Sequence, residues 1–338
     1  MQTIVIGHKN PDMDSICSAI AYARLKELLG MPGVIPARAG NTNARIDFVL
    51  TKFGVETPIF LSDASPRVGD VMQREVASVR ADSSAYDALQ LIAQKQLRGL
   101  PVTDSRRSCL GLLSADKLSH YLFPAREEAA NARKTVASLR SIVETIGGKV
   151  VAGSLSDESE EHILMVAAMN ADSFSKRLES HNAHQVVLFV GDREDIQMRA
   201  IEAGVRAVVV TGGLGVLKGV QAAALRSHIA IISSPYDTAT TVLLARGAVS
   251  AGRMVEPFTS FSPDTLLEAA RQTASASASY VFPVLDEDGA LIGVLSKSDF
   301  IKPPSRQLIL VDHNEMSQAV PGADTVPIIE ILDHHRVG

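Results

Sequence analysis

Three short apolar runs in this chain each lead into a cluster of histidine and acidic residues. The runs cover residues 4–6, 308–311 and 328–332, and the side chains that follow them are His8, Asp12, Asp14, Asp312, Asp333, His334 and His335. Apolar runs of this length between polar clusters are typical of buried parallel strands. Because ligands gather beyond the carboxyl ends of such strands, we expect the clusters to meet in one crevice.

The chemistry of these clusters indicates a metal site. The candidate ligands are His8, Asp12, Asp14, Asp312 and His334. Mixed imidazole and carboxylate ligands suit manganese, cobalt, iron or zinc better than calcium. Four or more such groups favour a two-metal hydrolytic centre, with ions ~3.5–4 Å apart, over one structural ion. For Asp14 or Ser15 alone, the cap of a following helix would be the simpler interpretation.

Composition excludes several classes of partner. The chain has 338 residues, enough for two or three domains, and a net charge of −5, which gives no electrostatic footprint for nucleic acid or an anionic membrane. Cys17 and Cys109 cannot form a disulfide framework and indicate a reducing compartment. No apolar run approaches the ~18 residues that span a bilayer. We therefore expect a cytoplasmic protein.

An internal repeat lies between the outer clusters. Pro101 is followed by Gly111 and Ser114, and Pro283 by Gly293 and Ser296, so proline to glycine is 10 positions in both copies (111 − 101 and 293 − 283). Each copy reads as helix, strand, tight turn, strand, helix. Such a unit cannot bury its apolar face alone, which predicts that the two copies pair.

The repeat resembles a tandem pair of CBS domains, a family that binds adenine nucleotides between its two copies. The resemblance implies AMP, ADP, ATP or a dinucleoside polyphosphate as regulator, with the candidate contacts Ser114, Asp116, Lys117, Tyr280, Ser296 and Asp299. Asp299 would hold a ribose, whereas Lys117, at the matching position, can contact a phosphate but cannot accept a hydrogen bond. Two questions stay open: whether Tyr280 stacks on adenine or packs in the core, and whether the pair only dimerises.

Residues 126–247, between the copies, carry an α/β pattern of their own. Strands at 186–190, 207–210 and 229–232 alternate with helices that begin near Glu194 and Thr238. This segment is similar to a DRTGG domain, with Asp192-Arg193 in one loop and Gly212-Gly213 in another. Paired glycines could admit a phosphate, but a bare turn is a weak signal, so a spacer or dimer contact is favoured.

The segments outside residues 64–305 are predicted to form one α/β domain. Its expected strands lie near residues 3–7, 34–37, 58–61, 307–311 and 328–332. The predicted fold class is α/β. Because the motifs of the outer segments resemble those of DHH phosphoesterases, the resemblance implies a parallel-sheet DHH domain interrupted by a tandem CBS pair that itself holds an α/β DRTGG domain. The predicted order is DHH domain, first segment (1–63), CBS domain 1 (64–125), DRTGG domain (126–247), CBS domain 2 (248–305) and DHH domain, second segment (306–338).

The three outer motifs, in this order, resemble the DHH phosphoesterase superfamily, and most of all a family II inorganic pyrophosphatase with a CBS-DRTGG-CBS insert. The resemblance implies a homodimer that hydrolyses pyrophosphate with two Mn²⁺ or Co²⁺ ions, with Mg²⁺ as a further candidate. His8 and Asp12 would hold one ion, Asp14 and His334 the other, and Asp312 would bridge them. Asp333 would orient a ligating histidine, and His335 would approach the substrate as the catalytic residue.

Family members continue past the last motif with another metal-binding Asp and a basic substrate-binding domain, whereas this sequence stops at Gly338. We therefore expect a truncated chain that hydrolyses pyrophosphate negligibly by itself. Two alternatives remain: a non-catalytic adenine-nucleotide sensor or scaffold, and a DHH phosphodiesterase that acts on cyclic dinucleotides or short oligonucleotides. The latter group typically has Gly where Met13 stands and lacks the motif at Asp312, which favours the pyrophosphatase.

Overall fold

A computed structural model describes residues 2–128, 133–303 and 305–335. It forms two compact units, one made of Met1–Val76 with Thr259–Gly338 and the other of Ala77–Phe258. Both units combine helices with parallel strand pairs, so the predicted α/β class is confirmed. None of the helices in these described ranges is long and apolar enough to cross a membrane.

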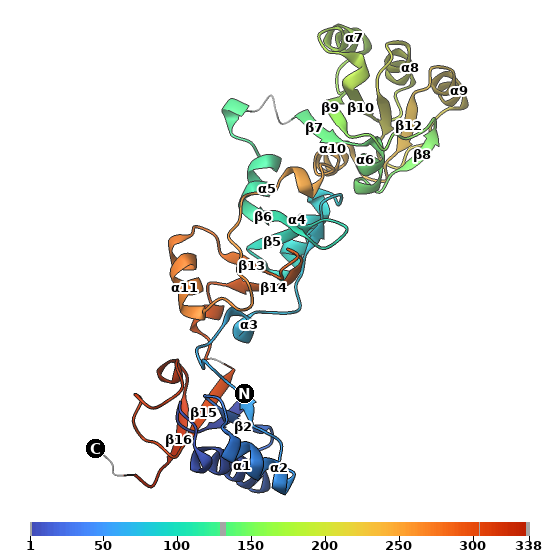
Figure 1. Ribbon diagram of the computed structural model, residues 1–338. Coiled ribbons are helices and arrows are strands. Elements are labelled where there is room, and N and C mark those ends of the chain that lie inside the picture. The colour runs from blue at the N-terminus through green and yellow to red at the C-terminus, as the bar shows by residue number, and fades with distance from the viewer. Residues whose placement is uncertain (1, 129–132, 304, 336–338) are drawn as a thin grey trace. The chain divides into compact units, whose positions relative to one another are not determined.

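The first unit contains a five-stranded parallel sheet of order β16-β15-β1-β2-β3. Its strands are β1 (Gln2–Ile6), β2 (Val34–Arg38), β3 (Ile59–Phe60), β15 (Arg306–Val311) and β16 (Ile328–Leu332). The central pair, β1 and β15, is buried on both faces, which explains its continuous apolar sequence. The sheet therefore joins the two ends of the chain, as their matching motifs predicted, and β1, β15 and β16 point their carboxyl ends the same way (Figure 1).

Two helices accompany this sheet, α1 (Met13–Leu28) and α2 (Ala44–Phe53). The cap of α1 is Asp12, whose Oδ1 accepts a hydrogen bond from the Ser15 backbone N–H at 3.0 Å. Asn43 caps α2, and Gly54 ends it in the left-handed conformation. The α1 cap fixes the loop that carries the first motif.

Each unit also holds one copy of the internal repeat. The first copy comprises β4 (Val79–Arg80), α4 (Ala85–Lys95), β5 (Gly99–Thr103), β6 (Cys109–Ser114) and α5 (Ala115–Leu122). The second comprises α11 (Leu267–Ala276), β13 (Val281–Leu285), β14 (Leu291–Ser296) and the 3₁₀ turn η5 (Asp299–Ile301). The prediction of a full closing helix in the second copy is wrong. Pro303 stops it, because proline disfavours helical backbone at the residue before it.

A short helical segment before each copy packs on the other copy. The helix α3 (Val68–Val71) precedes the first copy but bonds to the second, and the 3₁₀ turn η4 (Ala251–Arg253) precedes the second copy but bonds to the first. The backbone N–H groups of Val68 and Gly69 donate to Thr265 and Pro263, and those of Ala251 and Gly252 donate to Ser83 and Ala81. The two copies thus exchange these short segments, which the sequence analysis did not predict.

The remaining part of the second unit is a six-stranded sheet of order β7-β9-β10-β11-β12-β8, parallel in its centre with one antiparallel strand at each edge. Its strands are β7 (Lys134–Ala137), β8 (Lys149–Ala152), β9 (Glu160–Val166), β10 (Val186–Val190), β11 (Ala207–Val210) and β12 (Ala230–Ser233). Its helices are α6 (Leu139–Thr145), α7 (Ala171–Glu179), α8 (Glu194–Glu202), α9 (Lys218–Arg226) and α10 (Thr238–Arg246).

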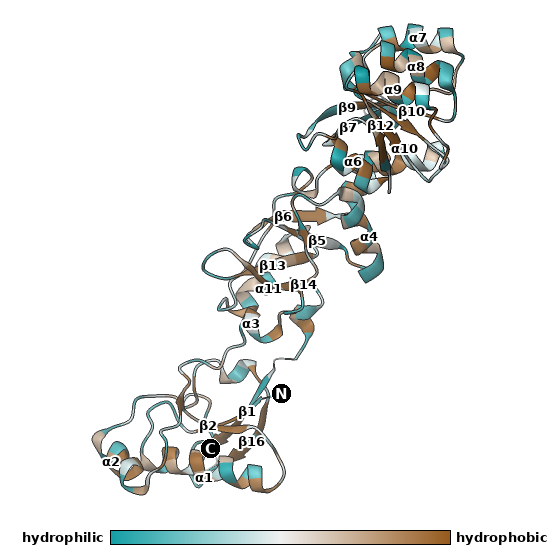
Figure 2. Cartoon of the chain, turned by 90° about the vertical axis from the view of Figure 1, so that its right-hand side faces the viewer, coloured by the Kyte–Doolittle hydropathy of each residue, from teal (hydrophilic) through white to brown (hydrophobic). Residues whose placement is uncertain are grey.

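Successive side chains of the central strands point to opposite faces of this sheet. Leu188 packs in the core below α7, α8 and α9, while Phe189 packs with α6 and α10 (Figure 1). Helices on both faces bury β10 and β11 completely. The strands β10 and β12 are accordingly apolar in their centres, while the outer helices carry polar residues (Figure 2).

Candidate metal centre

The three predicted clusters meet in one crevice at the carboxyl edge of the five-stranded sheet. The crevice has a volume of about 450 Å³ and is lined by His8, Lys9, Asn10, Asp12, Asp14, Asp312, Gln318, His334 and His335. All five side chains proposed as metal ligands are among them. The chain therefore brings together residues that lie more than 300 positions apart in sequence.

Asp312 lies at the centre of this group. Its Oδ2 is 3.4 Å from His8 Nε2, and its Oδ1 is 3.2 Å from His334 Nε2, so the two oxygens face different histidines. The side chain is only 4% exposed. Its backbone adopts the left-handed conformation (φ 61°), and its N–H donates to the Leu332 carbonyl at 2.9 Å. This arrangement directs the two oxygens of one carboxylate toward two different histidines.

The other two carboxylates extend the two halves of the crevice. Asp12 Oδ1 lies 3.7 Å from His8 Nε2, and Asp14 Oδ2 lies 3.5 Å from His334 Nε2. The helix cap that the sequence allowed for Asp14 is instead made by Asp12. These contacts place His8, Asp12 and Asp312 on one side of the crevice and Asp14, Asp312 and His334 on the other.

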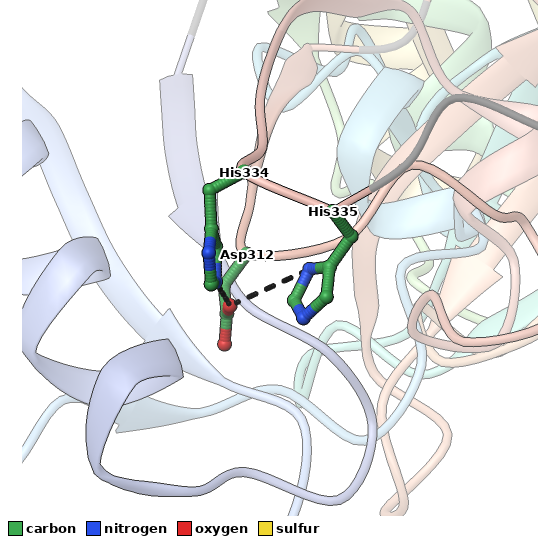
Figure 3. A group of neighbouring side chains, drawn as sticks. All are labelled: Asp312, His334 and His335. Carbon is green, nitrogen blue, oxygen red and sulfur yellow. Dashed lines mark hydrogen bonds and ion pairs between the residues drawn. The ribbon is translucent and has the colours of Figure 1, made fainter.

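His335 also faces Asp312, as Figure 3 shows, with Nδ1 3.9 Å from Oδ1. Its Nδ1 makes a closer contact of 2.7 Å with Asp333 Oδ1, and this hydrogen bond raises the pKa of His335. Burial alone would raise the pKa of Asp333, but the His335 side chain and the backbone N–H groups of both histidines outweigh it and lower that pKa. Asn314 donates to the other Asp333 oxygen at 2.5 Å. Asp333 thus orients His335 rather than His334.

Asp312, His334 and His335 also place donor atoms within 4.8 Å of one another. His335 is therefore close enough to Asp312 and His334 to act as a further metal ligand. The neighbouring His313 is different: it is buried, its Nδ1 lies 2.9 Å from the Val311 carbonyl, and burial lowers its pKa.

The donor set fits the implied metal. Three carboxylates with two or three imidazoles match the mixed oxygen and nitrogen ligands that Mn²⁺ and Co²⁺ accept. The sequence analysis missed three residues of the crevice, Lys9, Asn10 and Gln318. Lys9 and Asn10 lie inside the first motif and could have been found there. Gln318 carries no such signal; its backbone carbonyl accepts a hydrogen bond from the Lys9 N–H at 2.8 Å.

The nucleotide candidates of the second copy surround a buried carboxylate. Asp299 accepts hydrogen bonds from Ser296 Oγ at 2.7 Å, from Gln73 Nε2 at 3.0 Å and from the Lys302 ammonium. Burial raises the pKa of Asp299, but these donors prevail and lower it. Tyr280 is 51% exposed, and the Lys297 ammonium lies 5.4 Å from its ring centroid, so it does not pack in the core.

The first copy has a different acidic partner. Ser114 caps α5 by accepting from the Lys117 N–H at 3.1 Å and donates its hydroxyl hydrogen to Glu256 Oε2 at 2.7 Å. Asp116 and Lys117 are exposed. Glu256 was not among the predicted contacts, because nothing in its local sequence links it to Ser114.

The paired glycines of the six-stranded domain are committed to backbone hydrogen bonds. The N–H groups of Gly212 and Gly213 donate to the carbonyls of Tyr236 and Ser234 at 2.6 and 2.8 Å. Arg193 Nη1 donates to the Met169 carbonyl at 2.5 Å. A phosphate would have to displace these contacts, which favours the interpretation of this domain as a spacer or dimer contact.

Comparison with known families assigns the middle of the chain. The CBS domain family matches residues 68–123 and 248–304, and the DRTGG domain family matches residues 141–248. The middle of this chain is a CBS-DRTGG-CBS module. A solved structure of the CBS and DRTGG domains of the regulatory region of Clostridium perfringens pyrophosphatase, complexed with its activator diadenosine tetraphosphate, has the same fold. Its TM-score is 0.59 at 24% identity, over 68% of this chain and 99% of that structure.

Curated relatives cover the outer segments too. The chain is 31% identical over 337 residues to the cobalt-dependent inorganic pyrophosphatase of Clostridium perfringens. It is 28% identical over 336 residues to the probable manganese-dependent inorganic pyrophosphatase of Thermotoga maritima. These matches include 98% and 99% of this chain but only 60% of each relative. They confirm the predicted resemblance to manganese- and cobalt-dependent family II pyrophosphatases carrying the CBS-DRTGG-CBS module.

Proposed function

We propose that the crevice serves the metal-dependent hydrolysis of inorganic pyrophosphate to phosphate. The observation that carries this proposal is the position of Asp312, whose two oxygens face His8 on one side and His334 on the other. Asp12 and Asp14 complete two ligand groups that share one carboxylate. Two-metal hydrolytic centres use such shared ligands, and the similar proteins named above are cobalt- or manganese-dependent pyrophosphatases.

The residues of the crevice would divide the work as follows. His8 and Asp12 would hold one Mn²⁺ or Co²⁺ ion, Asp14 and His334 the other, and Asp312 both, with Mg²⁺ as a further candidate. When bound, such ions supply positive charge that stabilises phosphate oxygens and make nearby water more acidic. His335, whose raised pKa favours its protonated form, would bring a positive charge toward the pyrophosphate. Asp333 would keep that imidazole oriented.

Substrate binding by this chain is expected to be weak. Pyrophosphate carries about four negative charges, and positioning and charge stabilisation account for most of the rate in phosphoryl transfer. Among the described residues that line the crevice, Lys9 is the one lysine or arginine. We therefore expect this chain by itself to hydrolyse pyrophosphate negligibly, with any residual turnover requiring Mn²⁺ or Co²⁺.

The test is release of labelled phosphate from pyrophosphate by the purified chain with and without Mn²⁺, beside the matched variant Asp312→Asn. A slow, Mn²⁺-dependent release that the variant lacks would support the proposal. Release that is equal in the two proteins, or that does not depend on Mn²⁺, would contradict it. Nucleotide binding without metal-dependent hydrolysis would favour the sensor or scaffold alternative.

We also propose that the two CBS domains bind an adenine nucleotide that regulates this activity. Ser296 and Asp299 would contact a ribose on the second copy, beside the half-exposed side chain of Tyr280. On the first copy, Ser114, Asp116 and Lys117 remain the candidates. The matches to the CBS family support this proposal. Titration of the chain with AMP, ADP, ATP and diadenosine tetraphosphate would test it.

Two further parts of the proposal concern assembly and location. A homodimer is proposed by resemblance to the family, and sedimentation of the purified chain would test it. Both Cys17 and Cys109 are free thiols. Free thiols support a reducing compartment such as the cytoplasm, which localisation of a tagged chain would check.

A further inference from the structure

The two exchanged segments, residues 251–256 on the first CBS copy and residues 68–73 on the second, are structurally equivalent. In the first copy, the backbone N–H and carbonyl of Glu256 pair with those of Leu112 at 2.8 and 3.2 Å. In the second copy, Gln73 pairs with Val294 in the same two-bond pattern at 2.9 and 3.0 Å. Leu112 and Val294 occupy the same position of the repeat, directly after its glycine. Glu256 in the first copy is thus the counterpart of Gln73 in the second.

The repeat glycines confirm this alignment. A Cβ placed on Gly111 would lie 2.6 Å from Val255 Cβ, and one placed on Gly293 would lie 2.6 Å from Met72 Sδ. Val255 and Met72 directly precede Glu256 and Gln73. Each repeat therefore keeps a glycine because the same position of the exchanged segment crosses directly over it.

When the two copies are aligned in this way, the carboxylate that contacts the repeat serine occupies a different position in each copy. In the second copy it belongs to Asp299, three residues after Ser296, and the exchanged segment offers the neutral amide of Gln73. In the first copy the position three residues after the serine is Lys117, and the exchanged segment offers the carboxylate of Glu256. Both carboxylates accept a hydrogen bond from the repeat serine at the same distance of 2.7 Å.

We infer that Glu256 is the ribose-binding acceptor of the first CBS copy, in the role proposed for Asp299 in the second. This inference rests on the proposed regulation by adenine nucleotides. A ribose diol offers two O–H donors, and an ionised carboxylate can accept both at once. Lys117 cannot accept either, so in the first copy the carboxylate that contacts the repeat serine comes from Glu256. Glu256 is partly exposed, whereas Asp299 is fully buried, so the first copy presents its acceptor more openly.

The experiment compares AMP with 2′,3′-dideoxyadenosine monophosphate, which lacks the diol, by calorimetric titration of the full chain. The variants are Glu256→Gln, Asp299→Asn and the double variant Glu256→Gln/Lys117→Asp. The double variant gives the first copy the amide and carboxylate positions of the second. A hydrogen bond to a charged acceptor corresponds to a change in affinity of about tenfold or more.

We expect the wild-type chain to bind two AMP molecules, both with a preference for the diol. Glu256→Gln should weaken one of them about tenfold and remove its diol preference, while the other, held by Asp299, reports that the variant is folded. The double variant should restore both properties. Loss of one preference with Asp299→Asn but none with Glu256→Gln would overturn this inference alone. Absence of AMP binding to the wild-type chain would overturn it together with the proposed regulation.

Discussion

Replacing Asp312 by Asn should separate the charge of the shared carboxylate from its structural role. The backbone of Asp312 is left-handed, a conformation that asparagine tolerates and alanine does not favour. Its N–H donates to the Leu332 carbonyl, a bond that neither asparagine nor alanine at this position removes. The variant Asp312→Asn should therefore fold with near wild-type stability in the absence of metal. Asp312→Ala should be less stable than Asp312→Asn by about 1–2 kcal/mol.

The size of the expected loss of stability follows from how much bound Mn²⁺ stabilises the native state. Loss of a residue that merely supports a metal ligand costs 10–100-fold in affinity, so loss of a direct ligand shared by two ions should cost about 100-fold. At a Mn²⁺ concentration of about 100 times the wild-type Kd, each bound ion stabilises the native state by about 2.7 kcal/mol. A 100-fold weaker site gives only about 0.4 kcal/mol at the same concentration. The difference corresponds to a Tm shift of about 5–9 °C per ion for a unit of this size.

The assay is thermal unfolding of wild type, Asp312→Asn and Asp312→Ala, each with and without Mn²⁺. Wild type should gain Tm on addition of Mn²⁺, and both variants should lose most of that gain. The two variants should differ from each other mainly without metal. If Asp312→Asn kept the full wild-type shift, Asp312 would not be a ligand to both ions.

Other predictions concern the CBS copies. Gly111→Ala should lower Tm more than Gly293→Ala, because the new methyl group meets the stiff β-branched Val255 in the first copy but the flexible thioether of Met72 in the second. Overpacking of this kind costs about 1–3 kcal/mol. Equal Tm shifts in the two variants would argue against the close approach. The lowered pKa of Asp299 means that its charged form stabilises the fold at neutral pH and that this contribution disappears as the pH falls below about 4. Chemical denaturation should therefore show a wild-type advantage over Asp299→Asn at pH 7 that narrows in acid, and a constant advantage would contradict this reasoning.

Much of the fold was predictable because short apolar runs carry a strong signal when both faces of a sheet are covered. The strand over residues 186–190 and the one over 328–332 begin and end where the sequence analysis placed them. The strand near 58–61 shrinks to Ile59–Phe60, since it pairs with one neighbour only, through two residues. The closing helix of the second CBS copy was wrong because the effect of Pro303 was not weighed.

The candidate site was predictable to the extent that its residues share motifs. His8, Asp12, Asp14, Asp312 and His334 lie in three motifs with one chemistry, and parallel pairing brings those motifs to one edge. Glu256 illustrates the opposite case. Its contact with Ser114 depends on a segment exchange across 142 positions, which neither hydrophobic periodicity nor local turn chemistry reveals.

The most direct test of a two-metal centre is the number and mutual distance of Mn²⁺ ions bound to the purified chain. Equilibrium dialysis counts the ions, and electron paramagnetic resonance detects the exchange coupling of two Mn²⁺ ions held ~3.5–4 Å apart through a shared carboxylate. We predict two ions per chain with a coupled spectrum, and about one uncoupled ion or none in Asp312→Asn. One ion per wild-type chain, or two ions with independent spectra, would contradict the assignment of Asp312 as the ligand that both metals share.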